Sequence, residues 1–239
     1  MRARSLATIG AAALVALSLT ACSASTPGAS PSTTPDGETV PMVIDAAWLD
    51  GGRHIGIVTE GSSTCVPVVD TAEVQVDGTL AVTFAEPDAE TPCTADFAPR
   101  VSLAVVPAGV DPAVDLEIVV EGAGVDGGTS LTGVPGPVAG GETDYLPSAG
   151  WTNIDGTFVV LLWGSSTCRE YITSTSVTGE ASVTASLSGI PADKICTADM
   201  APNAVLAVAD GLQGVDGVEL TLTGAVESVT VPVLGVNAP

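Results

Sequence analysis

The sequence predicts an all-β protein made of two tandem antiparallel β-sandwich domains, each with one intradomain disulfide. First, the motifs GSSTC and CTAD each occur twice, at an offset of 103 residues. Second, short runs of alternating apolar residues recur between Asp-Gly pairs, a pattern typical of antiparallel sheets. Third, Val, Ala and Leu dominate the apolar residues, and no stretch has the periodicity of an amphipathic helix. An immunoglobulin-like topology is one form of this class, and a small barrel is the alternative.

The alternating runs predict the individual strands. Runs at 74–76 and 80–84 flank Asp77-Gly78, which predicts a hairpin with a type I′ turn. The segment FVVLLW at 158–163 is continuously apolar, so we expect a strand buried on both faces. Further strands are predicted at 116–120, 183–187, 218–222 and 229–233.

The N-terminus has the features of a secretory signal. Arg2 and Arg4 form a short basic region, and the apolar run at 6–19 is too short to be a membrane-spanning helix. The next residues, LTAC from Leu19 to Cys22, resemble the lipobox of bacterial lipoproteins. The resemblance implies cleavage before Cys22 and a diacylglycerol on its sulfur. The alternative is an ordinary signal peptide that ends in a cysteine.

Composition and repetition divide the chain into five segments. The stretch after Cys22 is rich in Ser, Thr, Pro and Gly, so it cannot bury a core and should act as a flexible tether. We predict a signal peptide at 1–21, a tether at 22–38, a first β-domain at 39–138, a linker at 139–141 and a second β-domain at 142–239.

The cysteines predict two disulfides. Five cysteines is an odd number, but lipid on Cys22 leaves four. Each copy contains one pair that encloses 27 residues, and each copy must fold with its own pair. We therefore predict the disulfides Cys65–Cys93 and Cys168–Cys196. Zinc is the rival use of these cysteines, but the sequence has neither closely spaced cysteine pairs nor histidine partners for them.

The GSSTC motifs also invite interpretation as a duplicated hydrolase site. A serine nucleophile needs a general base, usually histidine. The only histidine, His54, has Thr157 at the equivalent position of the second copy, and the chain has one lysine, Lys194. We therefore predict no enzymatic activity and no cofactor, and we interpret His54 as a partly exposed strand residue.

Asp96 and Asp199 place a carboxylate near a cysteine in both copies. We interpret them as turn or capping residues that accept backbone N–H bonds. Calcium binding is the weaker alternative, because no run matches an EF-hand loop.

Trp48 and Trp151 begin the two copies at equivalent positions. We predict that each fills the core of its copy, while surface aromatics of a carbohydrate-binding module are the alternative. Trp163 has Glu60 at its equivalent position, so the two copies should not present identical faces.

The charge of the chain limits its partners. Loss of Arg2 and Arg4 with the signal peptide lowers the formal net charge from −22 to −24. Such a chain repels phosphate backbones, which excludes nucleic acid as a partner. The tandem disulfide-linked β-domains also resemble uncharacterised secreted and lipoprotein domains of actinobacteria, a resemblance that implies location and fold.

Together these features predict a lipoprotein on the outer face of the cytoplasmic membrane. We expect a non-enzymatic binding or accessory role, with the membrane held through the N-terminal lipid and an envelope protein or a glycan as partner. A structural spacer or surface-coat protein is the alternative. An envelope enzyme or a calcium-binding module is less favoured.

The lipobox assignment has a direct test. Replacing Cys22 by Ala should abolish lipid labelling and release the protein from the membrane, because the acylated sulfur is lost. Metabolic labelling with a palmitate analogue measures this. Unchanged labelling of the Cys22→Ala protein would refute the assignment.

Overall fold

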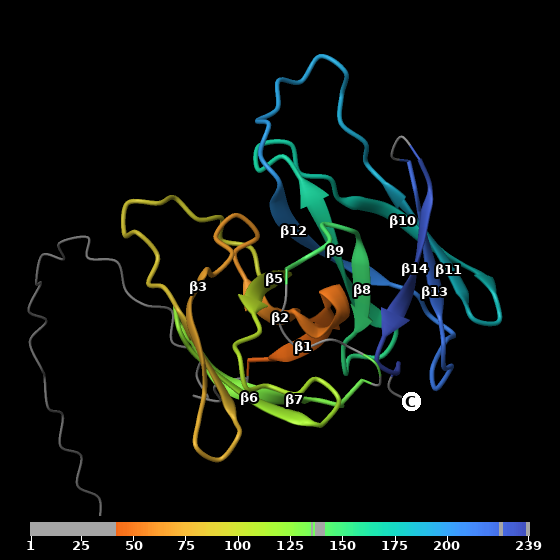
Figure 1. Cartoon of the computed structure of the whole chain (residues 1–239). Helices are drawn as coiled ribbons and strands as arrows, with labels where there is room; N and C mark the ends of the chain where they lie inside the picture. The colour runs from red at the N-terminus through yellow and green to blue at the C-terminus, as the bar shows by residue number, and fades with distance from the viewer. Residues whose placement is uncertain (1–41, 135, 137–141, 225–226, 238–239) are drawn as a thin grey trace, which may run out of the picture. The chain divides into compact units, whose positions relative to one another are not determined.

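The computed structural model describes residues 42–134, 136, 142–224 and 227–237 (Figure 1). The predicted signal peptide at 1–21, the tether at 22–38 with Cys22, and the linker at 139–141 lie outside the described residues. Within the described ranges the structure consists of strands and one short 3-10 turn, η1 (Asp50–Gly52), without an α-helix. The predicted all-β class is confirmed.

The first copy of the repeat forms two sheets, with strand orders β1-β2-β5 and β3-β4-β6-β7. Neighbouring strands are antiparallel except β4 and β6, which are parallel. The strands are β1 (Asp45–Leu49), β2 (His54–Gly61), β3 (Val69–Val74), β4 (Leu80–Phe84), β5 (Ala98–Val105), β6 (Leu116–Gly122) and β7 (Val125–Leu131).

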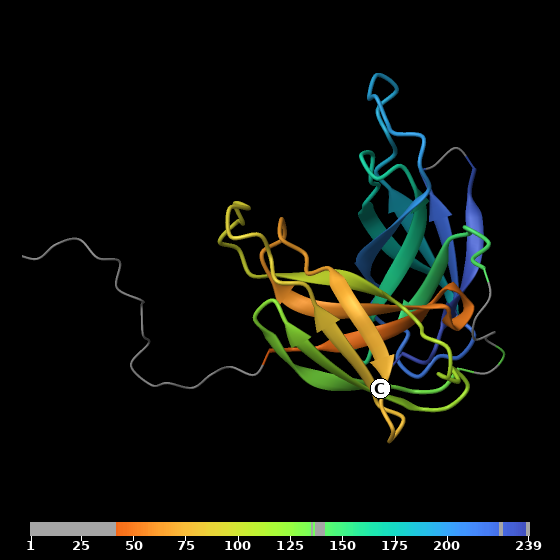
Figure 2. The same cartoon turned by 60° about the vertical axis from the view of Figure 1, so that its left-hand side comes forward.

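The second copy repeats this pairing, but its strands join into one seven-stranded sheet of order β10-β11-β13-β14-β8-β9-β12. The joint is a short parallel pairing of β14 with β8, Val233 with Ala149 and Leu234 with Gly150. The sheet therefore bends around its own core (Figures 1 and 2). Its strands are β8 (Ser148–Trp151), β9 (Thr157–Gly164), β10 (Ile172–Gly179), β11 (Ser182–Leu187), β12 (Ala201–Val208), β13 (Glu219–Thr223) and β14 (Val229–Leu234).

The strands predicted at 80–84, 116–120, 158–163, 183–187, 218–222 and 229–233 form within two residues of the expected bounds, whereas of the run at 74–76 only Val74 belongs to a strand. In β9, Phe158 and Val160 face the core of the second copy, while Val159 and Leu161 face the opposite side, and all four are fully buried. Burial of this strand on both faces is confirmed.

The predicted hairpin between β3 and β4 also forms, but its turn is wider than expected. Strand β3 ends at Val74, and Gly78 N donates to Gln75 O at 3.0 Å. Of the two central residues only Gly78 has a positive φ, 91°, whereas a type I′ turn requires positive φ at both. The type I′ prediction is therefore wrong, and the turn is of the longer kind that ends in a left-handed glycine.

Each copy has its own apolar core with a tryptophan at the predicted position. Trp48 is 2% exposed and its Nε1 donates to Thr132 O at 3.0 Å. Trp151 is 4% exposed and meets the Phe158 ring edge-on, with centroids 5.2 Å apart. The predicted core role of both tryptophans is confirmed, and neither offers a ring to a surface ligand.

A third apolar cluster joins the two copies. Ala47, Leu49 and Val58 of the first copy pack against Val159 and Leu161 of the second. Strands β1 and β2 are therefore buried on both faces, between the sheet β3-β4-β6-β7 and strands β8 and β9. Residues from 41 onward form one compact unit, and the domain boundaries predicted within it remain predictions.

Reciprocal hydrogen bonds reinforce this contact. Asp50 N donates to Ser148 Oγ at 2.8 Å. In the other direction, Asn153 Nδ2 and Ile154 N donate to the two carboxylate oxygens of Asp45, each at 2.9 Å. Asp45 is equivalent to Ser148, and Asp50 to Asn153, so an approximate two-fold axis relates the copies. The Asp45 carboxylate is 2% exposed, and these donors offset the cost of burying it.

Strands β1 and β8 approach each other most closely at Gly150. A Cβ atom built at Gly150 would lie 2.0 Å from the carbonyl oxygen of Trp48, so no larger residue fits without moving the backbone. This close approach sets the spacing of the two copies on the β1–β8 side.

Replacing Gly150 by Ala should therefore lower the free energy of unfolding by roughly 1–3 kcal/mol, since overpacking forces the backbones apart. Gly164→Ala is the matched control, because a Cβ there meets nothing within 4 Å. Urea denaturation measures both. Equal destabilisation by the two changes would contradict the close-packing argument.

Candidate functional site

The two predicted disulfides, Cys65–Cys93 and Cys168–Cys196, are present, with Cα–Cα distances of 5.6 and 5.5 Å. Each ties the segment after the second strand of its copy to the long loop before β5 or β12 (Figure 1). For a sequence separation of 28, the chain-entropy description attributes about 3.5 kcal/mol of stabilisation to each bond. The disulfides thus hold two long loops that carry no strands of their own.

The GSSTC and CTAD motifs meet beside each disulfide. In the first copy, the Ser62 and Thr94 hydroxyl oxygens are 2.9 Å apart, and Thr94 N donates to Thr64 Oγ1 at 3.0 Å. Asp96 Oδ1 accepts from Ser63 N at 3.2 Å and also from the Thr94 hydroxyl. The second copy repeats these contacts with Ser165, Ser166, Thr167, Thr197 and Asp199. The duplicated motifs therefore form a structural hydrogen-bond network.

Both aspartates are stabilised in their charged form. The Thr94 hydroxyl, followed by Ser63, lowers the pKa of Asp96 to about 2. Thr197, followed by Ser166, lowers the pKa of Asp199 to about 2. Asp96 and Asp199 each accept a backbone N–H bond as expected, but the donor is Ser63 or Ser166 of the other motif, so each carboxylate links two loops and does not cap a local turn. In the part of the chain that the structure describes, no three His, Cys, Asp or Glu side chains gather where they could hold a metal ion.

His54 lies at the opposite end of β2 from the first GSSTC motif. It begins the strand, whereas Gly61 ends it, which places the two roughly 20 Å apart. Its ring does lie near the second motif, with its centroid 5.7 Å from that of Trp163, which precedes Gly164 and Ser165, but among the described contacts no hydrogen bond joins His54 to a serine. Its Nδ1 is instead 3.2 Å from Asp50 Oδ2, and its side chain is 12% exposed. The interpretation of His54 as a partly exposed strand residue is confirmed.

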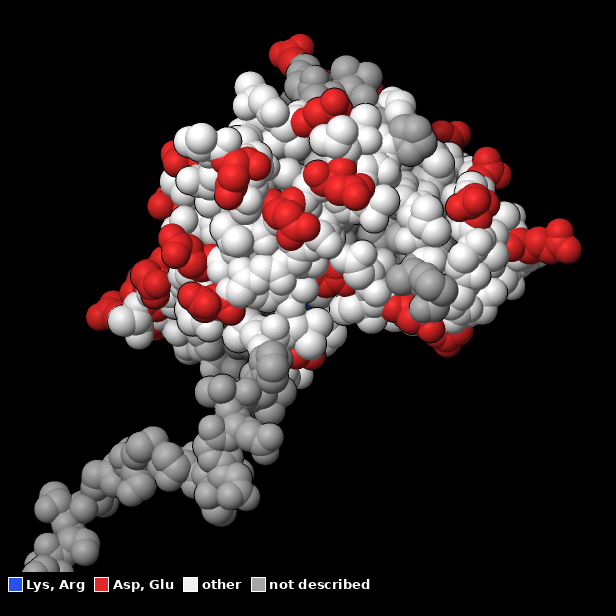
Figure 3. Space-filling model, turned by 90° about the horizontal axis from the view of Figure 1, so that it is seen from below, with Lys and Arg blue, Asp and Glu red and all other residues white. Residues whose placement is uncertain are grey.

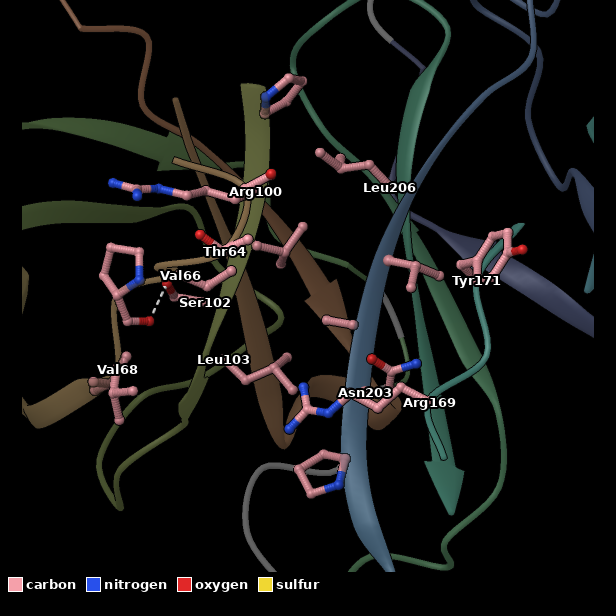
Figure 4. A pocket seen from close by; sticks show the side chains of 18 of the residues that line it. Thr64, Val66, Val68, Arg100, Ser102, Leu103, Arg169, Tyr171, Asn203 and Leu206 are labelled. Atoms are coloured by element: carbon pink, nitrogen blue, oxygen red, sulfur yellow. Dashed lines mark hydrogen bonds between the residues drawn. The ribbon is translucent and has the colours of Figure 1, made fainter. Parts of the chain in front are cut away.

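A cleft of about 780 Å³ lies between strands β5 and β12, and we call it the β5–β12 cleft (Figure 4). Apolar side chains of both strands lie along it, among them Val101, Leu103, Ala204 and Leu206. Its two walls are the segment at 66–69, which follows Cys65, and the equivalent segment at 169–172, which follows Cys168. These are equivalent parts of the two copies, so the cleft lies across the approximate two-fold axis.

The cleft differs in charge from the rest of the molecule. The chain has 28 acidic and 6 basic residues, yet no Asp or Glu is among the described residues that line the cleft. Two arginines, Arg100 and Arg169, do line it. On another face, seen from below, Asp and Glu side chains are scattered widely (Figure 3). The cleft therefore combines an apolar lining with positive charge in an acidic protein.

The two arginines have different roles. Arg100 Nη1 donates to Cys65 O at 2.6 Å and to Ser62 O at 3.3 Å, so it fastens the first disulfide loop to β5. Burial lowers the pKa of Arg100. Arg169 is exposed and donates only through Nε, to Ser166 O at 3.4 Å, among the contacts of the described residues. Its terminal nitrogens remain available to a negatively charged group of a partner.

Side-chain hydrogen bonds hold the cleft walls in place. Ser102 Oγ donates to Pro67 O at 2.6 Å, as the dashed line in Figure 4 marks. Asn203 Nδ2 donates to Glu170 O at 2.7 Å. Both bonds fix a wall segment to the neighbouring edge strand, so the cleft is preformed.

Exposed apolar side chains lie at the cleft and in the disulfide loops. Val68 and Tyr171, at equivalent positions of the two walls, are 68% and 62% exposed. Phe97 and Met200, also equivalent, follow the two CTAD motifs and are 69% and 57% exposed. Of these four residues, Val68 and Tyr171 line the cleft, so a partner seated in it would cover their apolar atoms.

Sequence reasoning found the motifs that build the frame but missed the cleft. Its residues come from segments about 100 positions apart, and no local pattern links them. One signal was present: Arg100 and Arg169 each follow a duplicated motif in a chain with very few basic residues.

No protein-family model matches the chain, and no curated protein or solved structure matches it either. Among the residues that the structure describes, no helix is long and apolar enough to cross a membrane. The function therefore has to be argued from the cleft, the loops and the N-terminal motif.

The duplicated network predicts a selective pKa change. Thr94→Val should raise the pKa of Asp96 from about 2 toward its ordinary value of 3.8, because the largest stabilising bond is lost. Asp199 is the internal control and should stay at about 2. NMR titration of the carboxyl carbons measures both.

The effect on stability has a definite sign. Because the pKa of Asp96 is lowered in the folded protein, its carboxylate stabilises the fold above pH 3.8, and that contribution disappears as the pH falls toward 2. The Thr94→Val protein should lose less stability over this range than the unaltered chain. An unchanged Asp96 titration would contradict the role given to Thr94.

Proposed function

We propose that this chain is a lipid-anchored, extracytoplasmic binding protein of the cell envelope that holds a partner protein at the β5–β12 cleft and has no enzymatic activity. The observation that carries the proposal is the cleft itself. It is preformed, contains apolar side chains of both copies, is free of acidic lining residues in the described part of the chain and is supplied with the exposed Arg169.

The N-terminal residues and the disulfides support the proposed location. The LTAC motif ending at Cys22 would receive the lipid, and the Ser/Thr/Pro-rich segment at 22–38 would hold the folded part away from the membrane surface. Disulfides such as Cys65–Cys93 and Cys168–Cys196 persist in oxidising compartments outside the cytoplasm.

The proposal includes the finer architecture. Each copy would be one sandwich of a tandem pair, as its separate apolar core and equivalent strand pairing suggest. The two sandwiches would act as one unit, because the third cluster packs them together and the cleft requires both.

The absence of catalysis is proposed on chemical grounds. The hydroxyl groups of Ser62 and Ser165 are bonded to neighbouring threonines, and the one histidine of the chain, His54, contacts Asp50 and makes no hydrogen bond to either serine among the described contacts. Neither serine has the general base that a nucleophile requires.

A binding role is favoured over a spacer role by the exposed apolar residues. A spacer needs only a soluble surface, whereas Val68 and Tyr171 expose apolar atoms in a preformed cleft. Burial of such side chains against a partner is the usual source of binding free energy at an interface, with charge setting the orientation. We therefore expect a protein segment that is apolar with an acidic group opposite Arg169.

Site-specific photocross-linking of the intact lipoprotein in its native envelope tests this role. A photoreactive phenylalanine at Tyr171, in the cleft, should form one discrete adduct. The same group at Val119, exposed on β6 outside the cleft, is the control and should not form that adduct. Arg169→Glu should reduce the Tyr171 adduct several-fold, because it reverses the charge opposite the acidic group.

Two outcomes would count against the proposal. Equal adducts from Tyr171 and Val119 would indicate non-specific contact, and no adduct from a folded, anchored protein would favour the spacer role. An adduct that survives Arg169→Glu unchanged would remove the charge argument.

A further inference from the structure

A second pocket, of about 430 Å³, lies where the two copies meet and shares only Pro202 with the β5–β12 cleft. We call it the Trp163 pocket. Arg53, His54 and Val105 come from the first copy, and Tyr145, Trp163 and Met200 come from the second. Because β5 and β12 contribute opposite ends to it, the pocket exists only when the two copies are packed together.

Aromatic rings make up one side of the Trp163 pocket. The Tyr145 ring meets the Trp163 ring edge-on with centroids 5.1 Å apart, and the His54 ring does the same at 5.7 Å. The other two tryptophans of the chain are buried in the cores of the copies. Trp163 differs from them because it lines a surface pocket.

Two residues that line this pocket each have a buried hydrogen-bond donor without a partner. The donor atoms are Trp163 Nε1 and Arg53 Nε, and the only other buried side-chain N or O atom without a partner among the described residues is Asn237 Nδ2. Buried polar groups in folded proteins nearly always have a hydrogen-bond partner, so each exception requires an explanation. Both atoms are donors without acceptor capacity, so a ligand that satisfies them must supply acceptor atoms.

The charge of the pocket is already balanced. Asp50 Oδ1 lies 3.4 Å from Arg53 Nη1, and Asp50 Oδ2 lies 3.2 Å from His54 Nδ1. The carboxylate of Asp50 therefore neutralises the cation beside the aromatic rings. A neutral ligand rich in oxygen acceptors fits this environment better than an anion does.

We propose that the Trp163 pocket binds a carbohydrate, as a neutral pyranose ring. A sugar ring has an apolar C–H face, which packs against Trp163 and Tyr145, and an edge of oxygens, which accept from Trp163 Nε1 and Arg53 Nε. The hydroxyl of Thr143, which also lines the pocket, adds a further polar contact. The site goes beyond the proposed protein-binding role, because it uses a different pocket and a different ligand.

Entry of the ligand requires a small rearrangement, because neighbouring atoms cover both unpartnered donors. Tyr145 and Met200 are 52% and 57% exposed, so their side chains are free to move aside. Tyr145 also has a φ of 56°, a left-handed conformation that is uncommon for a residue other than glycine.

The two-fold relation of the copies supplies a matched control. The positions equivalent to Trp163 and His54 are Glu60 and Thr157, which can form no aromatic wall. A change at Glu60 therefore alters the corresponding strand position of the other copy without touching the Trp163 pocket.

NMR of the three tryptophan indole N–H groups in the mature chain tests the proposal. Trp163→Phe identifies the Trp163 signal. The probes are methyl mannopyranoside, N,N′-diacetylchitobiose and a galactose oligosaccharide, with acetate and phosphate as anionic probes. At least one sugar should shift the Trp163 signal saturably, and the Trp48 signal, whose donor is bonded to Thr132 O, should not move.

The affinity for that sugar should respond to the pocket alone. Trp163→Phe keeps an aromatic ring but loses the donor, so it should weaken binding roughly 2- to 10-fold. Tyr145→Ala, at an exposed side chain, should weaken it as well without unfolding the protein. Glu60→Gln should leave the affinity unchanged.

The proposal is overturned if no sugar shifts the Trp163 signal at millimolar concentration, or if acetate or phosphate shifts it instead. It is also overturned if Trp163→Phe and Tyr145→Ala bind the sugar as tightly as the unaltered chain. None of these outcomes bears on the β5–β12 cleft, whose test uses Tyr171 and Arg169.

Discussion

The packing of the sheet β1-β2-β5 against strands β8, β9 and β12 is the contact on which the rest of this structure depends. It buries β2 and β9 on both faces and requires a glycine at position 150, where the backbones of β1 and β8 meet. Because the copies touch closely on the β1–β8 side, the β5–β12 cleft and the Trp163 pocket form where β5 and β12 meet. Each copy by itself would contain half of either site.

The two copies share one frame, and the residues around that frame differ between them. The GSSTC–CTAD network and the disulfide are repeated contact for contact, so both loops are held by the same hydrogen bonds. The residues around them differ. Arg100 fastens one loop, whereas Asn203 at the equivalent position fastens a wall segment, and Trp163 stands where the first copy has Glu60. An interface between unlike halves can therefore carry two different sites.

Local pattern predicted most of the fold. Alternating and continuous apolar runs located β4, β6, β9, β11, β13 and β14, since side chains of a strand alternate between its faces, whereas strands such as β1, β5 and β12 were not predicted. The equal spacing of the cysteines predicted the disulfides, and the position of Trp48 and Trp151 predicted two cores. The type I′ turn at Asp77-Gly78 was wrong because the register of β3 and β4 demands a longer loop. The joining of β14 to β8 into one sheet was not visible, because two residue pairs far apart in sequence make that joint.

The sequence by itself determined the all-β class, about half of the strands, the disulfide pairing and the acidic charge, because each depends on residue type and short spacing. Only the tertiary structure decided that the outer faces of β2 and β9 pack on each other. The apolar residues of a strand face indicate that the face will be buried, but they do not indicate which other face will cover it. For the same reason, neither the β5–β12 cleft nor the Trp163 pocket could be predicted from the sequence. Arg100 and Arg169 line one site together, and His54 and Trp163 the other, only after that packing has brought the two copies together.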